Sequence, residues 1–139
     1  MNPVKKAYGY VVRYRNGKPQ LLVFQHPFKE AGIQIPKGTV KGGEDTYDAV
    51  IREIKEETGL EDFMVEEMIA EDLWRNDDGK IHHRFFYKIK AKEERHEWYY
   101  KPTGGGEEEG LKFRFFWISS ENEITLIKGH GDYLGSIFS

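Results

Sequence analysis

The chain has 139 residues, enough for one domain whose core needs no disulfides. A formal net charge of −3 argues against a general nucleic-acid-binding protein, which would carry a basic surplus, but leaves a small phosphorylated ligand open. The absence of cysteine excludes disulfides, thiolate nucleophiles and iron–sulfur ligation, and favours the cytoplasm.

The first half of the chain is predicted to contain two strands, a loop and a helix. In chain order the elements before the helix are a strand at 7–14, a hairpin turn at Asn16-Gly17, a strand at 21–25, a short extended piece at 33–36 and a three-glycine loop at 37–44.

The helix is expected at about residues 46–58. Asp45 can cap its first turn, with Asp48 three residues further on, and Gly59 suits a left-handed exit.

The second half is richer in strands. We expect strands at 63–73 and 80–90 around a hairpin turn at 76–79, no assigned structure at 93–100, a loop at 103–110, a strand at 111–118 and a partly helical tail. This order predicts an α+β fold with a mixed sheet, built as a single domain over residues 1–139. The first residues lack the apolar core of a signal peptide and no apolar run reaches membrane-spanning length, so no membrane association is expected.

The predicted helix carries its chemistry on one side. At 100° per residue, Glu53, Glu56 and Glu57 fall within an arc roughly 100° wide, and the small Ala49 lies on the same side, which lets another group approach. The neighbouring stripe, expected to pack on the sheet, consists of Tyr47, Val50, Ile51 and Ile54.

Three converging carboxylates repel one another, and a hard divalent cation relieves that repulsion. Mg²⁺ or Mn²⁺ would suit these oxygen ligands and would also accept phosphate oxygens. Arg52 lies four residues before Glu56 and can brace that carboxylate from the side. Taken alone, the charge run also fits a solvated helix face.

The stretch from Gly38 to Leu60 resembles the signature of the Nudix hydrolase superfamily, G-x5-E-x7-R-E-U-x-E-E-x-G-U, where U is a bulky aliphatic residue. All nine specified positions match: Gly38, Glu44, Arg52, Glu53, Ile54, Glu56, Glu57, Gly59 and Leu60.

The resemblance implies an α/β/α sandwich and metal-dependent hydrolysis of a diphosphate linkage in a nucleoside triphosphate, a dinucleoside polyphosphate or a nucleotide sugar. It implies that Arg52 orients a ligand glutamate and that Glu44 is a further metal-associated or structural carboxylate. The implied metal ligands are Glu53, Glu56, Glu57 and the Gly38 carbonyl, with Mg²⁺ or Mn²⁺ as the cofactor.

The general base is open between a signature glutamate and an acidic, glycine-rich loop. In the family this role varies, and the loop at 104–110 offers Glu107, Glu108 and Glu109, of which Glu108 is placed with the catalytic candidates. Its glycines would let a carboxylate swing towards the metal site. The alternative is an exposed hairpin without a catalytic role.

Substrate contacts are expected from lysines and aromatic rings. Lys37 and Lys41 flank the start of the signature and could contact phosphates. His82 and His83 alternate sides on a strand and are not expected to share a metal. Candidates for stacking on a base, each also suited to core packing, are Trp74, Phe86, Phe28 and Tyr87.

The substrate stays open. Some ADP-ribose hydrolases of the superfamily carry a proline about sixteen positions after the signature, and many diadenosine-polyphosphate hydrolases a tyrosine at about seventeen. Those positions are Asn76 and Asp77 here, so neither mark is present and both assignments are disfavoured. The alternatives are a non-catalytic, Nudix-like nucleotide-sensing module and an RNA 5′-end pyrophosphohydrolase, the latter disfavoured by the lack of a basic stripe. The oligomeric state is left undetermined.

Overall fold

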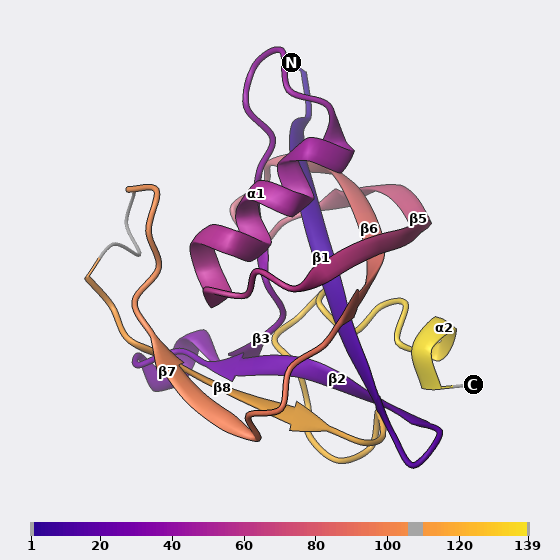
Figure 1. Cartoon of the computed structure of the whole chain (residues 1–139). Coiled ribbons are helices and arrows are strands. Elements are labelled where there is room, and N and C mark those ends of the chain that lie inside the picture. The colour runs from indigo at the N-terminus through magenta and orange to yellow at the C-terminus, as the bar shows by residue number, and fades with distance from the viewer. Residues whose placement is uncertain (1, 106–109, 139) are drawn as a thin grey trace.

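A mixed eight-stranded sheet forms the centre of the computed structural model, which describes residues 2–105 and 110–138. The strands are β1 (Val4–Arg15), β2 (Lys18–Gln25), β3 (Ile33–Gln34), β4 (Lys37–Thr39), β5 (Phe63–Arg75), β6 (Ile81–Ala91), β7 (Glu97–Tyr100) and β8 (Phe113–Ile118). The sheet order is β5-β6-β1-β2-β8-β7 (Figure 1), with β3 beside β2 and β4 beside β1. β1 and β6 run parallel, and the other pairings of the described strands are antiparallel.

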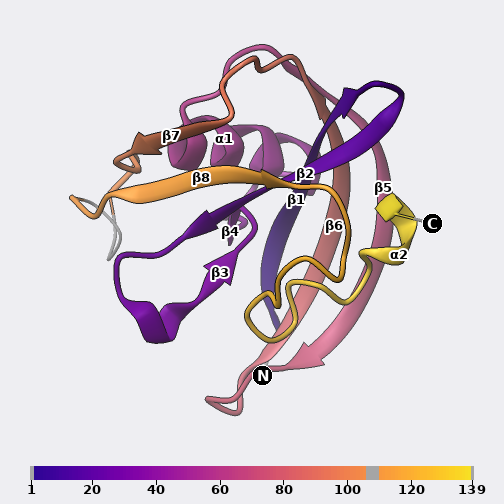
Figure 2. The same ribbon diagram turned by 90° about the horizontal axis from the view of Figure 1, so that it is seen from below.

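Two of these strands were not expected from the sequence. β4 lies within the predicted glycine-rich loop, and β7 lies in the stretch 93–100, for which the sequence pattern predicts no element. Both exist because of pairing partners that are distant in the chain. β4 pairs with Lys6–Tyr8 of β1, and β7 pairs with Phe113–Phe116 of β8 (Figure 2).

Helix α1 (Thr46–Thr58) has the predicted bounds. The Asp45 side chain accepts a hydrogen bond from the Asp48 N–H at 2.8 Å, which satisfies one free donor of the first turn. Gly59 ends the helix at φ 76°, and its N–H donates to the Lys55 carbonyl. The predicted caps are therefore confirmed.

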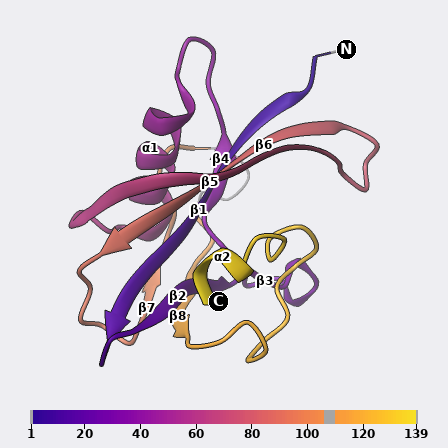
Figure 3. The ribbon, with the colours of Figure 1, turned by 90° about the vertical axis from the view of Figure 1, so that its right-hand side faces the viewer.

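The sheet separates two hydrophobic cores. In the side view, α1 and the C-terminal segment lie on different sides of the long strands (Figure 3). The first lies between α1 and the sheet and includes Val11, Ile54 and Phe115. The second lies beneath the C-terminal segment 119–138 and includes Tyr10, Phe86 and Ile137. This arrangement confirms an α+β fold of the sandwich type.

The packing face of α1 is rotated from the expected one. Val50 and Ile54 are buried and Ile51 is half-buried, as predicted. Tyr47, however, is 49% exposed and meets the edge of the Tyr87 ring, whereas Ala49 is fully buried. The expected positions of Tyr47 and Ala49 were therefore wrong, because the small Ala49 side chain lets α1 sit close to the sheet.

The C-terminal layer is mostly turns. It contains one four-residue helix, α2 (Gly135–Phe138), among the described residues. Arg84 of β6 fixes this layer to the sheet, donating to the Gly129 carbonyl at 3.0 Å and to Asp132 Oδ2 at 2.9 Å. No helix in the described part of the chain is both long enough and apolar enough to cross a membrane.

Candidate functional site

A cleft of about 660 Å³ opens between α1, β4 and the segments 26–31 and 102–105. Its volume is in the range of small-molecule sites. The side chains that α1 turns towards it are Arg52, Glu53, Glu56 and Glu57. The predicted convergence of the glutamates is thus present, and it faces a concave surface.

Arg52 holds the carboxylates around it in a fixed arrangement. Its guanidinium donates from Nε to Glu44 Oε2 at 2.8 Å and from Nη2 to Glu44 Oε1 at 3.0 Å, a two-pronged pair. Nη1 donates to Glu53 at 2.7 Å and to Glu56 at 3.1 Å. Nη2 also donates to the Thr39 carbonyl, which ties the signature loop to α1.

Glu44 is a loop anchor in this arrangement. The hydrogen bonds from Arg52, followed by that from the Lys41 N–H, lower the pKa of the Glu44 carboxyl to about 2. Glu44 is therefore ionised at neutral pH and holds the loop in register with the helix. Conversely, the hydrogen bonds that Arg52 donates to Glu44 raise the pKa of Arg52 above the ordinary arginine value.

Two glycines let backbone approach the glutamates closely. A Cβ on Gly38 would lie 1.9 Å from the Glu53 carboxyl carbon, and one on Gly104 would lie 2.5 Å from Glu56 Oε2. Each would overlap the carboxyl group. Only glycine at these positions leaves room for the observed placement of Glu53 and Glu56.

The donor chemistry fits a hard divalent cation, because Glu53, Glu56 and Glu57 present carboxylate oxygens to the cleft. Within residues 2–105 and 110–138, however, no three His, Asp or Glu side chains form a ready-made cation site. Arg52 occupies one oxygen each of Glu53 and Glu56. Each carboxylate has lone pairs to spare, so a cation can share these groups with the guanidinium.

Lysines of β1, of β4 and of the loop after β4 line the cleft. Lys37 and Lys41, expected from the sequence, both line it. Lys6 lines it as well, and its Nζ donates to Thr39 Oγ1 at 2.7 Å. The sequence analysis missed Lys6 because only the β1–β4 pairing, which sets Lys6 opposite Thr39, brings it to the signature.

The structure separates the four aromatic stacking candidates. Phe86 is fully buried and stacked on Tyr8, which contradicts its expected contact with substrate. Trp74 is half-buried, lies over the Arg84 guanidinium and against Gly129, and is not among the residues that line the cleft. Tyr87 belongs to the core under α1. Phe28 alone of the four lines the cleft.

His82 and His83 take different partners, as expected from their alternation. His82 lies beside the Trp74 ring, whereas His83 Nε2 bonds to Glu71 at 2.6 Å.

The acidic loop candidates Glu107, Glu108 and Glu109 lie outside the described residues. The segment that leads to them is attached to α1: the Thr103 N–H donates to the Glu56 carbonyl at 2.8 Å. Trp98 Nε1 donates to the Thr58 carbonyl at 3.1 Å. The chain thus reaches the cleft wall at Gly104 and Gly105.

The fold and the cleft define an α+β protein that sets the carboxylates of a capped helix beside lysines from a sheet. A model of the NUDIX domain matches residues 5–132. The chain therefore belongs to the NUDIX family.

Similar proteins include enzymes of known substrate. The chain is 38% identical over 53 residues to ADP-ribose pyrophosphatase from Saccharomyces cerevisiae; the match covers 35% of this chain and about a quarter (23%) of the yeast protein. A C. elegans Ap4A hydrolase structure is 29% identical with a TM-score of 0.56, covering 65% of this chain and 69% of that one. A NUDIX hydrolase structure from Nitrosomonas europaea has a TM-score of 0.59 at 19% identity over 85% and 73%, a likeness of fold.

Proposed function

We propose that this protein hydrolyses a diphosphate linkage in a nucleotide-type small molecule with the help of a divalent cation. The observation that carries the proposal is one cleft lined both by Glu53, Glu56 and Glu57 and by Lys6, Lys37 and Lys41. Carboxylates suit a hard cation, and lysines suit the phosphate chain that the cation also binds. The intact signature favours hydrolysis over nucleotide sensing.

Each group has a distinct role in this proposal. Glu53, Glu56, Glu57 and the Gly38 carbonyl would hold Mg²⁺ or Mn²⁺, which would neutralise phosphate charge and lower the pKa of a bound water. Arg52 orients Glu53 and Glu56. The lysines fix the phosphates. A glutamate of the signature or of the 107–109 run would accept the proton from the attacking water.

The similar proteins narrow the substrates to test first. ADP-ribose and Ap4A are the compounds named for the yeast and C. elegans proteins. Each joins a nucleoside through phosphates to a second moiety. We propose that this chain acts on the same class of compound. The cytoplasmic location of the protein also remains a prediction.

The experiment is a phosphate- and nucleotide-release screen of ADP-ribose, dinucleoside polyphosphates, nucleotide sugars and nucleoside triphosphates with Mg²⁺ and Mn²⁺. We expect turnover of at least one class, reduced at least 100-fold in Glu57→Gln. Millimolar Mg²⁺ should also raise the wild-type Tm through linkage, and less so that of the variant.

Glu61→Gln is the matched control, because Glu61 is near α1 but does not line this cleft. It should keep both the activity and the Mg²⁺ response. A wild-type protein that turns over none of the panel with either metal would refute the proposed reaction.

A further inference from the structure

Phe28 presents an aromatic ring in the same cleft as the glutamates and lysines. Its side chain is 56% exposed, although phenylalanine is normally buried. Among the described residues that line the cleft, the other aromatic ring is that of His26. Single exposed apolar side chains are common on protein surfaces, so the residues that pack against the Phe28 ring decide whether it is part of a binding site.

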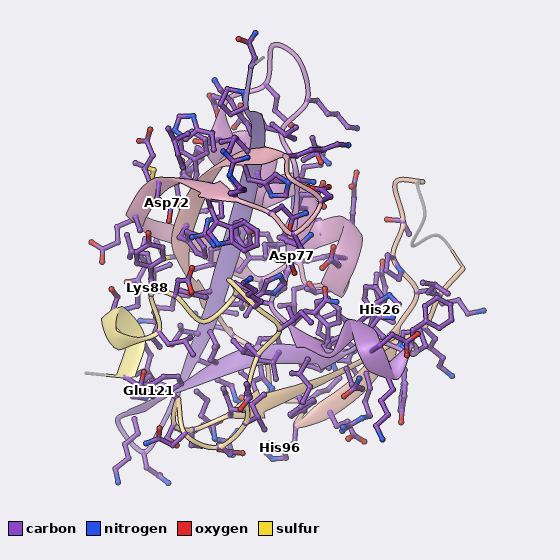
Figure 4. All side chains as sticks on the ribbon, turned by 180° about the vertical axis from the view of Figure 1, so that it is seen from behind. His26, Asp72, Asp77, Lys88, His96 and Glu121 are labelled. Atoms are coloured by element: carbon purple, nitrogen blue, oxygen red, sulfur yellow. The ribbon has the colours of Figure 1, made fainter. Side chains whose placement is uncertain are left out.

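A series of rings connects Phe28 to the core. Phe24 and Phe113, both fully buried, stack with centroids 4.4 Å apart. His26 lies 5.2 Å from Phe113, and Phe28 lies 5.2 Å from His26. His26 is 7% exposed, and Figure 4 shows it beside the short helix η1 (Lys29–Ala31). Phe28 is thus the exposed end of a packed aromatic series.

Hydrogen bonds fix the backbone that carries this ring. The Phe28 N–H donates to His26 Nδ1 at 3.0 Å, which places the proton of a neutral His26 ring on Nε2. The Phe28 carbonyl accepts from the Ala31 N–H at 2.9 Å, and the Ala31 carbonyl accepts from Gln34 Nε2 at 2.7 Å. The backbone that carries the ring is therefore fixed before a ligand binds, and the ring itself packs against His26.

We propose that Phe28 is the stacking surface for the nucleobase of the substrate and that His26 positions it. This inference rests on the proposed function, because the lysines and the cation must take the phosphates of the same ligand. A ligand with an anionic phosphate chain and a planar aromatic end matches the two halves of the cleft. Base-on-aromatic stacking tolerates different bases, so Phe28 selects for nucleotides as a class and not for one base.

The test compares two ligands that carry the same methylene-bridged, non-hydrolysable triphosphate chain, one with a nucleoside and one without: the ATP analogue and the correspondingly bridged tripolyphosphate. Calorimetry with Mg²⁺ measures their Kd values for wild type, Phe28→Ala and Phe28→Trp. We expect Phe28→Ala to weaken the ATP analogue about tenfold or more and to leave tripolyphosphate unchanged. Phe28→Trp should retain the affinity. The adenine proton resonances of the bound analogue should shift upfield in wild type and not in Phe28→Ala.

Tyr14→Ala serves as the control, because Tyr14 is a 44% exposed aromatic that does not line the cleft. It should change neither Kd. Equal losses for both ligands, or no loss for either, would overturn the stacking role of Phe28. Because binding is measured without turnover, the result is independent of whether the hydrolysis screen succeeds.

Discussion

At the scale of single residues, Arg52 organises the acidic side of the cleft. One guanidinium contacts Glu44 through two nitrogens and also reaches Glu53 and Glu56. It offsets the repulsion that these carboxylates would otherwise exert on one another. Lysine carries the same charge but lacks the planar fork, so it cannot make these contacts together.

The first prediction concerns Arg52→Lys. We expect kcat to fall about 10- to 100-fold with KM nearly unchanged, because the carboxylates would lose their orientation while the lysines proposed to bind phosphate would stay. Steady-state kinetics on the best substrate of the screen measures this. Arg75→Lys is the control, since Arg75 is exposed and donates to the Gly79 carbonyl far from the signature. An Arg52→Lys enzyme with wild-type kcat would contradict the orienting role.

At the scale of elements, β7 and the segment that follows it are attached to the C-terminal half of α1. Thr103 and Trp98 both donate to carbonyls of α1, and Gly104 abuts the Glu56 carboxylate. The helix that carries the candidate metal ligands and the approach to the acidic loop therefore form one packed unit. A displacement at Gly104 would be transmitted directly to Glu56.

The second prediction concerns Gly104→Ala. The added Cβ would lie 2.5 Å from Glu56 Oε2, so Glu56 or the segment must move, and we expect activity to fall about 10- to 100-fold. Gly110→Ala is matched, because Gly110 also has positive φ (88° against 92°) but nothing lies within 4 Å of its Cβ position. Both variants carry similar backbone strain. If the two lost activity equally, contact with Glu56 would not be the cause.

At the scale of the whole molecule, the C-terminal layer is held by buried polar groups. Tyr10 donates to the His130 carbonyl at 2.7 Å, and His130 Nδ1 accepts from the Ile35 N–H at 3.1 Å. Arg84, almost fully buried, joins Asp72 of β5 to Asp132. These bonds connect the last residues to β1, β5, β6 and the segment at Ile35, all of which are distant in the sequence.

The third prediction follows from His130. Burial, reinforced by Lys37 and Arg84, lowers the pKa of His130 to about 3 in the folded protein. The unfolded chain takes up this proton near pH 6.5 and the folded protein does not, so stability falls as the pH drops below about 6.5. By pH 4.5 the loss from this group is on the order of 3 kcal/mol, or a Tm drop on the order of 10 °C.

His130→Asn separates this effect from the others. Asparagine keeps an acceptor for Ile35 but does not titrate, so the slope of Tm between pH 6.5 and 4.5 should decrease. The slope should not vanish, because the pKa of His82 is also lowered, first by burial. Glu44 adds a further loss of stability below this window. Its carboxyl has a pKa of about 2 in the folded protein, so the unfolded chain takes up a proton there at a higher pH than the folded protein does. An unchanged slope in the variant would rule His130 out as the group responsible.

The sequence by itself determined α1, its two caps and the convergence of Glu53, Glu56 and Glu57. These features depend on contacts three or four residues apart, which the helical period fixes locally. The Arg52–Glu56 contact was predictable for the same reason. The strands of the first two hairpins were also located, with every end within three residues of the predicted one.

Only the tertiary structure decided which distant residues complete the cleft. Lys6 reaches it through the β1–β4 pairing, and β4 itself exists only because of that pairing. The sequence alone does not distinguish Phe28, Trp74 and Phe86, because each is an aromatic residue suited both to stacking on a base and to core packing. The layers packed on either side of the sheet left Phe28 exposed at the cleft and buried Phe86, because burial depends on contacts between segments far apart in the chain.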